Sequence, residues 1–307
     1  MKAEIVHSAS PKGRIAVLIP VYNEPGCMGD TLRSLCGQGV PFTLVLVDDG
    51  STPPLAVGVA PLDYPVVLLR MPKNGGIEAA LNAGLEYIEQ AGFELIARVD
   101  AGDRCAPNRL ARQQAFLDAH PEVHLVGSNT EWRRDDGSVA FDVSLPTTHD
   151  EIARALHHRP CLLHPTVMFR AALVRDVGPY SYAYPAAEDY EFFWRIARRY
   201  RVANIPEMLH TQRFHAGSIS VRNRRRQLRS KLRIQLKYFR PAEPLSFVGV
   251  AKTLALMSVP YGGVVAIKRA LNKGRARKKP GDDPLLDAKN ARPAVNASST
   301  TTAPVKA

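Results

Sequence analysis

Short apolar runs and longer amphipathic segments alternate along the first 120 residues. Runs of adjacent apolar residues, which are typical of strands buried on both faces, occupy residues 15–21, 43–47, 66–70 and 95–99. Segments with helical spacing occupy residues 28–36, 77–90 and 107–120. This alternation predicts an α/β fold with a mostly parallel, Rossmann-like central sheet, flanked by helices and joined by right-handed crossovers.

The pattern becomes less regular after residue 122. It predicts two extended segments, a hairpin turn at Asp135–Gly137, a helix rich in aromatic residues and an edge strand. The extended segments are 123–127 and 162–169, the helix is 188–200 and the edge strand is 201–205.

The C-terminal part has a different character. Residues 222–240 combine apolar positions with nine basic residues, which predicts a basic amphipathic helix. Residues 245–267 are apolar but are interrupted by Lys252 and Pro260. The interruptions favour insertion at a membrane interface over ordinary helix packing, and both over a membrane-spanning helix. The Pro-, Ala-, Ser- and Thr-rich residues 273–307 are expected to be disordered.

Composition places the chain among globular proteins, but its charge is unevenly distributed. The 307 residues are 45% hydrophobic and 23% charged, which excludes a collagen, a disordered polyelectrolyte and a polytopic membrane protein. The net charge of +12 suggests a nucleic acid or an anionic membrane as partner. However, residues 222–279 hold 17 Lys and Arg against one acid, whereas residues 1–221 hold 21 basic and 25 acidic residues. The positive charge therefore belongs to the C-terminal part, and the body is slightly acidic.

The cysteines and the N-terminus indicate a reducing compartment. The four cysteines form no Cys-x-x-Cys pair and no zinc spacing, so we expect reduced thiols. The first apolar run, residues 15–21, is too short for a signal peptide and is followed by Asn23 and Glu24. We therefore expect a cytoplasmic body.

Polar side chains gather where three of the predicted strands end. Tyr22–Glu24 follow the first strand, Asp48 and Asp49 the second, and Asp100 and Asp103 the fourth. In open parallel sheets, ligands bind beyond these carboxyl ends. Crowded carboxylates repel one another unless a cation neutralises them, and Mg²⁺ or Mn²⁺ with a diphosphate suits such an edge. A simpler alternative for the Asp48–Asp49 pair is that it caps the following turn.

Two common nucleotide sites are disfavoured. The chain has no lysine-containing phosphate loop, and no Gly-x-Gly-x-x-Gly follows the first strand. Eight other motifs occur in this order: Pro20-Val-Tyr-Asn-Glu24, Val47-Asp-Asp-Gly-Ser51, Asn74-Gly75-Gly76 with Asn82, Ala97-Arg-Val-Asp-Ala-Gly-Asp103, His164-Pro165, Gly178-Pro-Tyr180, Glu188-Asp189-Tyr190 and His215-Ala-Gly-Ser-Ile-Ser220. In order and spacing they resemble glycosyltransferase family 2, whose members are inverting nucleotide-sugar transferases with the GT-A fold. The resemblance covers about residues 13–221 and is greatest to members that build bacterial surface polysaccharides.

The resemblance implies roles for individual residues. Asp189 matches the catalytic base, Asp103 and His215 match metal ligands for Mg²⁺ or Mn²⁺, and Asp49 would accept a hydrogen bond from a uracil or thymine N–H. The implied nucleotide-sugar contacts are Pro20, Tyr22, Glu24, Asp49, Asn74, Gly75, Asp100, Glu188 and His215.

Some positions depart from the family pattern or allow a second interpretation. The family motif Asp-x-Asp-Asp reads Asp100-Ala-Gly-Asp103 here, so Gly102 replaces a carboxylate that often contacts ribose or the metal shell. This departure puts metal affinity and ribose contacts in question. Asp189 also suits the N-terminus of its helix through the helix dipole, and the two roles can coexist. His164 is better explained as structural or acceptor-lining, and Arg98 as a buried ion-pair partner.

We therefore expect an inverting glycosyltransferase that moves a sugar from UDP or dTDP to a glycan or lipid-linked acceptor in polysaccharide biosynthesis. Its GT-A domain would span residues 13–221. Residues 222–272 would bind the anionic inner face of the cell membrane, and 273–307 would be the tail. A catalytically silent nucleotide-sugar-binding protein is the alternative. A nucleic-acid-binding protein is less favoured, because few aromatic residues interleave with the basic run and no reader fold is evident.

Overall fold

The computed structural model describes most of the chain. The described residues are 2–23, 28–56, 62–134, 136–213 and 223–258. The predictions for Glu24, His215, residues 259–272 and the tail at 273–307 therefore lie outside the described residues.

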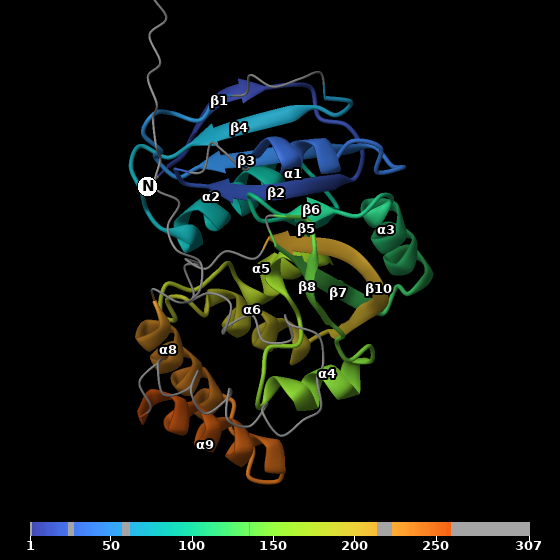
Figure 1. The fold of residues 1–307 in the computed structure, drawn as a ribbon. Helices are drawn as coiled ribbons and strands as arrows, with labels where there is room; N and C mark the ends of the chain where they lie inside the picture. The colour runs from blue at the N-terminus through green and yellow to red at the C-terminus, as the bar shows by residue number, and fades with distance from the viewer. Residues whose placement is uncertain (1, 24–27, 57–61, 135, 214–222, 259–307) are drawn as a thin grey trace, which may run out of the picture.

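A sheet of ten strands runs through the described part (Figure 1). The strands are β1 (Glu4–Ser8), β2 (Ile15–Val21), β3 (Phe42–Asp48), β4 (Val66–Arg70), β5 (Leu95–Arg98), β6 (Arg104–Cys105), β7 (Val123–Arg133), β8 (Val139–Val143), β9 (Met168–Arg170) and β10 (Arg201–Arg213). Their order is β1-β4-β3-β2-β5-β9-β7-β10-β6, and β8 pairs with β7. Strands β4, β3, β2 and β5 are parallel neighbours, so their carboxyl ends meet at one edge.

Helices cover both faces of this sheet, which confirms the predicted α/β class with a central, mostly parallel sheet. The described helices are α1 (Met28–Ser34), α2 (Ile77–Gln90), α3 (Arg109–Ala119), α4 (His149–Leu156), α5 (Leu173–Val177), α6 (Glu188–Ala197), α8 (Arg224–Lys237) and α9 (Pro244–Ser258), with a 3₁₀ turn, η1, at His164–Thr166; α8 and α9 lie away from the sheet (Figure 1). Alternate residues of β2 enter different cores, because successive strand side chains point to opposite faces. Ile15 and Val17 join the core under α1 and α3, while Ala16 and Leu18 join the core under α2 and α6. Both faces are buried, which explains why the strands read as unbroken apolar runs.

Several elements were not predicted. Strand β1 pairs antiparallel with β4 at the edge of the sheet, although all five of its residues are exposed and only Ile5 and Val6 are apolar. Helix α4 begins at a capping box between Thr148 and Glu151, a signal that the sequence does contain. The predicted edge strand at 201–205 pairs with β7, but the strand continues to Arg213 and there gains β6 on its other side.

Helices α8 and α9 lie side by side, at the opposite end of the molecule from β1 and β4 (Figure 1). Glu191 of α6 is 1% exposed and accepts hydrogen bonds from Lys237 Nζ at 2.9 Å and Tyr238 Oη at 3.2 Å. The ring of Tyr238 stacks on Trp194 of α6 at 4.8 Å. The basic amphipathic helix is therefore confirmed as a helix, and it is fastened directly to α6.

We expect Glu191→Gln to lower the free energy of unfolding by about 2–3 kcal/mol, because it leaves Lys237 and Arg195 without their buried counter-charge. Urea denaturation followed by circular dichroism measures this. Glu89→Gln is the matched control, since Glu89 pairs with Arg175 at the surface and its loss should cost less than about 0.5 kcal/mol. Equal effects of the two changes would contradict the assigned role of Glu191.

Candidate active site at the carboxyl edge of the sheet

The loops that follow β2 and β3 are tied together by their own polar groups. The Asn23 N–H donates to Ser51 Oγ at 2.9 Å, and the Thr52 N–H donates to Asn23 Oδ1 at 2.9 Å. Tyr22, at the end of β2, is 47% exposed, and Pro20 is partly buried within the strand. The exposed Tyr22 ring is thus free for a ligand at this edge.

Asp48 is a structural residue. Its carboxylate accepts hydrogen bonds from the Ser51 N–H at 2.8 Å and the Leu55 N–H at 3.1 Å, and it pairs with Arg70 at 2.8 Å. The side chain is fully buried. For Asp48, turn capping is therefore the correct interpretation.

Asp49 fastens β3 to the N-terminus of α2. Its two carboxylate oxygens accept the Gly75 N–H at 2.8 Å and the Gly76 N–H at 2.9 Å. Burial raises the pKa of Asp49, and the two N–H donors oppose that shift. The approach depends on Gly50, because a Cβ there would lie 2.6 Å from the Lys73 carbonyl carbon. Asn74 is exposed beside this junction. The structure therefore brings the predicted Asp49, Asn74 and Gly75 together.

Asp100 and Asp103 are the two ends of a β-turn, because the Asp103 N–H donates to the Asp100 carbonyl at 3.2 Å. Gly102, the third residue of the turn, has φ +96° and donates its N–H to Thr31 Oγ1 at 2.9 Å. A side chain is strained at this φ. The missing family carboxylate thus corresponds to a position where this backbone favours glycine.

Sequence reasoning did not find His210, which lies beside Asp103. His210 Nε2 is 3.1 Å from Asp103 Oδ2, both side chains are buried, and His210 Nδ1 lies 2.8 Å from Thr130 Oγ1. Neither Nε2 nor Oδ2 forms a hydrogen bond with another described residue. Nothing in the sequence marks His210, because only the pairing of β10 with β6 brings it near.

Glu188 and Asp189 begin α6 close to the same strand end. Asp189 is half-buried, and its Oδ1 accepts the Tyr190 N–H at 2.6 Å. Burial raises the pKa of Asp189, while this N–H and the charge of Arg98 oppose the shift. Burial, and then the charge of Asp189, raise the pKa of Glu188 to about 8, so Glu188 is mostly protonated at pH 7. One neutral and one ionisable carboxyl group therefore stand side by side.

Arg98, the last residue of β5, lies buried beneath these carboxyl groups. Its guanidinium is 1% exposed and pairs with Asp100, as the buried ion-pair interpretation expected. His164 shares a hydrogen bond with Tyr180 Oη at 2.8 Å, and burial lowers the pKa of His164 well below its ordinary value. The Asn82 side chain forms two hydrogen bonds with the backbone of Tyr180: its Nδ2 donates to the carbonyl, and its Oδ1 accepts the N–H. His164, Tyr180 and Asn82, which belong to the motifs of the family, are thus joined to one another by hydrogen bonds beneath the site.

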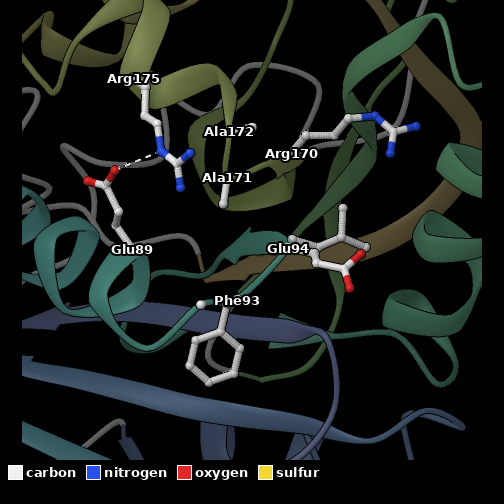
Figure 2. A pocket seen from close by; sticks show the side chains of 9 residues that line it. Glu89, Phe93, Glu94, Arg170, Ala171, Ala172 and Arg175 are labelled. Atoms are coloured by element: carbon white, nitrogen blue, oxygen red, sulfur yellow. Dashed lines mark hydrogen bonds and ion pairs between the residues drawn. The ribbon is translucent and has the colours of Figure 1, made fainter.

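A hollow of about 360 Å³ lies away from the acidic strand ends. Figure 2 shows that Glu89, Phe93, Glu94, Arg170 and Arg175 line it, at the N-terminal end of β5. The acidic site follows the other end of β5. The hollow therefore belongs to a different part of the molecule.

Among the residues that the structure describes, no group of three or more His, Cys, Asp or Glu side chains is placed to hold a metal ion. The buried Asp103 oxygen and His210 nitrogen are nevertheless donors that Mn²⁺ accepts, and a diphosphate supplies further oxygens. The residues present fit a metal that is shared with a bound nucleotide.

A mostly parallel α/β sheet with acidic side chains gathered at its carboxyl edge belongs to the class of folds that bind ligands beyond that edge. Within that class, the sequence pattern of glycosyl transferase family 2 matches residues 16–178. The chain is also 33% identical over 229 residues to the amylovoran biosynthesis glycosyltransferase AmsE of Erwinia amylovora, covering 72% of this chain and 83% of that protein. This chain belongs to glycosyl transferase family 2, and it is a glycosyltransferase.

Solved structures agree on the GT-A fold. TarS 1–349 of S. aureus in complex with UDP-GlcNAc matches with a TM-score of 0.60 at 19% identity, covering 90% of this chain and 79% of that chain. The mannosyltransferase PcManGT of Pyrobaculum calidifontis, in complex with GDP-Man and Mn²⁺, matches with a TM-score of 0.56 at 19% identity, covering 92% of this chain and 87% of that chain.

We expect Gly102→Ala to lower the free energy of unfolding by about 1–2 kcal/mol, because an alanine is strained at φ +96°. Thermal and urea denaturation measure the loss. Gly102→Asn is the control, since asparagine tolerates positive φ better and should lose less. If alanine were as stable as glycine here, conformation would not explain the missing carboxylate.

Proposed function

We propose that this enzyme moves a sugar, with inversion, from a UDP- or dTDP-sugar to a hydroxyl of a glycan or lipid-linked acceptor in polysaccharide biosynthesis. The observation that carries the proposal is that Asp189 lies close enough to Asp100, at the carboxyl edge of the sheet, for the charge of Asp100 to raise the pKa of Asp189. The similarity to AmsE, an amylovoran biosynthesis glycosyltransferase, supports the process, and the similarity to TarS solved with UDP-GlcNAc supports the donor class.

Asp189 is the proposed base. Inversion requires the acceptor hydroxyl to lose its proton on the face opposite the departing diphosphate, and one positioned carboxylate suffices for this. The raised pKa of Asp189 brings a carboxylate closer to the working pH, which favours proton transfer. Glu188, protonated at neutral pH, is a hydrogen-bond donor for a sugar hydroxyl.

The nucleotide would lie over the strand ends. In this proposal Tyr22, Asp49 and the exposed Asn74 face the nucleoside, with Pro20, Gly75 and Asp100 around it. Asp103 would hold Mg²⁺ or Mn²⁺, together with His210 and with His215, which lies outside the described residues. When bound, the metal offsets the negative charge that develops on the departing diphosphate. PcManGT, solved with GDP-Man and Mn²⁺, supports a divalent metal in this fold.

The alternative of a silent nucleotide-sugar-binding protein rested on Gly102. That residue completes a turn whose two ends are still Asp100 and Asp103, and it leaves Asp189 in place on α6. The departure removes one possible ribose contact and leaves the proposed base intact. Catalysis is therefore favoured over silent binding.

We expect Asp189→Asn to reduce sugar transfer about 1,000-fold while the affinity for the donor changes little, because the base is lost but the nucleotide contacts remain. The measurement is turnover against a panel of UDP- and dTDP-sugars with a lipid-linked acceptor, with donor affinity from calorimetry. Asp176→Asn, a surface carboxylate paired with Tyr200, is the control and should transfer at the wild-type rate. An Asp189→Asn enzyme with wild-type turnover would contradict the assignment.

We propose further that α8 and α9 hold the enzyme on the anionic inner face of the cell membrane. The outward face of α8 carries the exposed Arg225, Arg226 and Arg229. The outward face of α9 is apolar: Phe247 and Val248 are 55% and 50% exposed. No helix in the described ranges has the length and apolar character needed to cross a bilayer. Arginines at the headgroup phosphates and an apolar helix just beneath them fit an interfacial position.

The triple change of Arg225, Arg226 and Arg229 to Gln should weaken binding to anionic vesicles about 100-fold at low salt, since each cation contributes about 1 kcal/mol. Sedimentation with phosphatidylglycerol-containing vesicles measures it. The same change at the distant, exposed Arg33, Arg112 and Arg175 is the control and should bind as the wild type does. Tighter retention on duplex DNA than on vesicles would favour the nucleic-acid alternative instead.

A further inference from the structure

Arg98 is a charged residue in an unusual place. It is the last residue of β5, a central strand with β2 on one side and β9 on the other. Its side chain is 1% exposed and forms an ion pair with Asp100, whose side chain is 37% exposed. Its Nε and both terminal nitrogens form no hydrogen bond with any described residue.

Stability does not explain this arrangement. A guanidinium carries five N–H donors, and enclosing it with a single carboxylate partner costs free energy that one ion pair does not offset. The other fully buried arginine, Arg109, shows the usual solution: it donates to Gln113 Oε1, Cys105 Sγ and the Arg98 carbonyl. A hydrophobic residue at position 98 would pack at lower cost. The charge of Arg98 therefore calls for a functional explanation.

The groups around Arg98 supply one. Asp100 pairs with the guanidinium, and Glu188 and Asp189 lie close enough for the Arg98 charge to lower the pKa of both against the effect of burial. The other titratable groups that interact with this carboxyl cluster are Glu78 of α2, Asp103, Tyr180 and Tyr190. His164 interacts with Arg98 itself, and Arg195 interacts with Tyr180. Arg195 is already engaged by Glu191 and by the carbonyls of residues 177–179. Arg98 is thus the enclosed cation that all three carboxyl groups share.

We propose that Arg98 is a positioning residue of the transfer reaction, whose enclosed guanidinium orients Asp100 and supplies the counter-charge for Asp189. This inference rests on the proposed role of Asp189 as the base. Arg98 does not touch the substrate, because its side chain is closed off from solvent beneath the carboxylates.

The direction of the effect on pH dependence follows from the charges. Asp189 acts as a base only when ionised, so transfer falls as the pH drops through its pKa. Removing the positive charge of Arg98 raises that pKa, and the acidic limb of the kcat/KM profile moves to higher pH. Raising the pH then restores much of the lost rate. A purely structural loss would instead lower the rate equally at every pH.

The test is the pH profile of kcat/KM for sugar transfer by Arg98→Gln, which removes the charge and keeps polar atoms in place. The acidic limb should move up by about one pH unit or more. Arg98→Lys keeps the charge but loses the planar guanidinium. The acidic limb of its kcat/KM profile should therefore stay near that of the wild type. Its kcat should fall about tenfold, and its KM for the donor should stay within twofold. Either variant alone decides the matter if the other does not fold.

Arg170→Gln is the matched control. Arg170 lies on β9 opposite Leu95, where β5 begins, and it donates to the backbone carbonyls of Val123 and Leu117. Its loss should reduce stability without moving the pH profile.

Two results would overturn the inference: a normalised Arg98→Gln profile that superimposes on that of the wild type, or an Arg98→Lys enzyme with the wild-type kcat. The proposed function has its own outcome. If Asp189→Asn transfers sugar normally, the base assignment fails. If Asp189→Asn is inactive but the Arg98 profiles are unchanged, only the role of Arg98 fails.

Discussion

The electrostatics of one strand end govern much of this structure. Glu188 and Asp189 lie beside the more exposed Asp100. Burial penalises the ionised forms of Glu188 and Asp189, and the negative charges of neighbouring carboxylates add to that penalty. Two devices hold the group together: Glu188 keeps its proton near pH 7, and Arg98 contributes a positive charge from below. With one carboxyl neutral and one cation present, the site carries a smaller negative charge than its acidic residues suggest. Such a site accepts an anionic nucleotide more readily.

The backbone shares this task of placing charge. Asp48 and Asp49 are adjacent but have different partners. The Asp48 carboxylate caps the turn and pairs with Arg70, whereas the Asp49 carboxylate accepts the two backbone N–H groups at the N-terminus of α2. A helix N-terminus attracts negative charge, so α2 holds Asp49 at a fixed place on the edge. The turn at Gly102 does the same for Asp103. Rigid strand ends and short turns thus fix the acidic groups before any ligand arrives.

The sequence predicts the parallel strands well because burial on both faces leaves unbroken apolar runs, as at Ile15–Val21. It also predicts the candidate residues at strand ends, since topology alone brings those ends together. It does not reveal β1, because the two adjacent apolar residues of that strand make too short a run to indicate a strand. Nor does it reveal His210, which reaches Asp103 only through a pairing between distant strands. For Arg98 the sequence indicates a buried ion pair, which the structure has with Asp100, but it does not indicate that the charge also acts on Glu188 and Asp189 of a distant helix.

The contacts of α6 connect the two functional ends of the molecule. Its N-terminus carries Asp189, while Glu191 and Trp194, less than two turns further on, hold Lys237 and Tyr238 of the α8 region. Gly249 of α9 packs so closely on the His157 carbonyl that a Cβ would lie 2.1 Å from it, which fixes the second helix as well. Because α8 and α9 are fastened to the helix that bears the proposed base, a membrane that binds them would also set the direction from which an acceptor hydroxyl reaches Asp189. Helices α8 and α9 would then determine the geometry of transfer as well as its location.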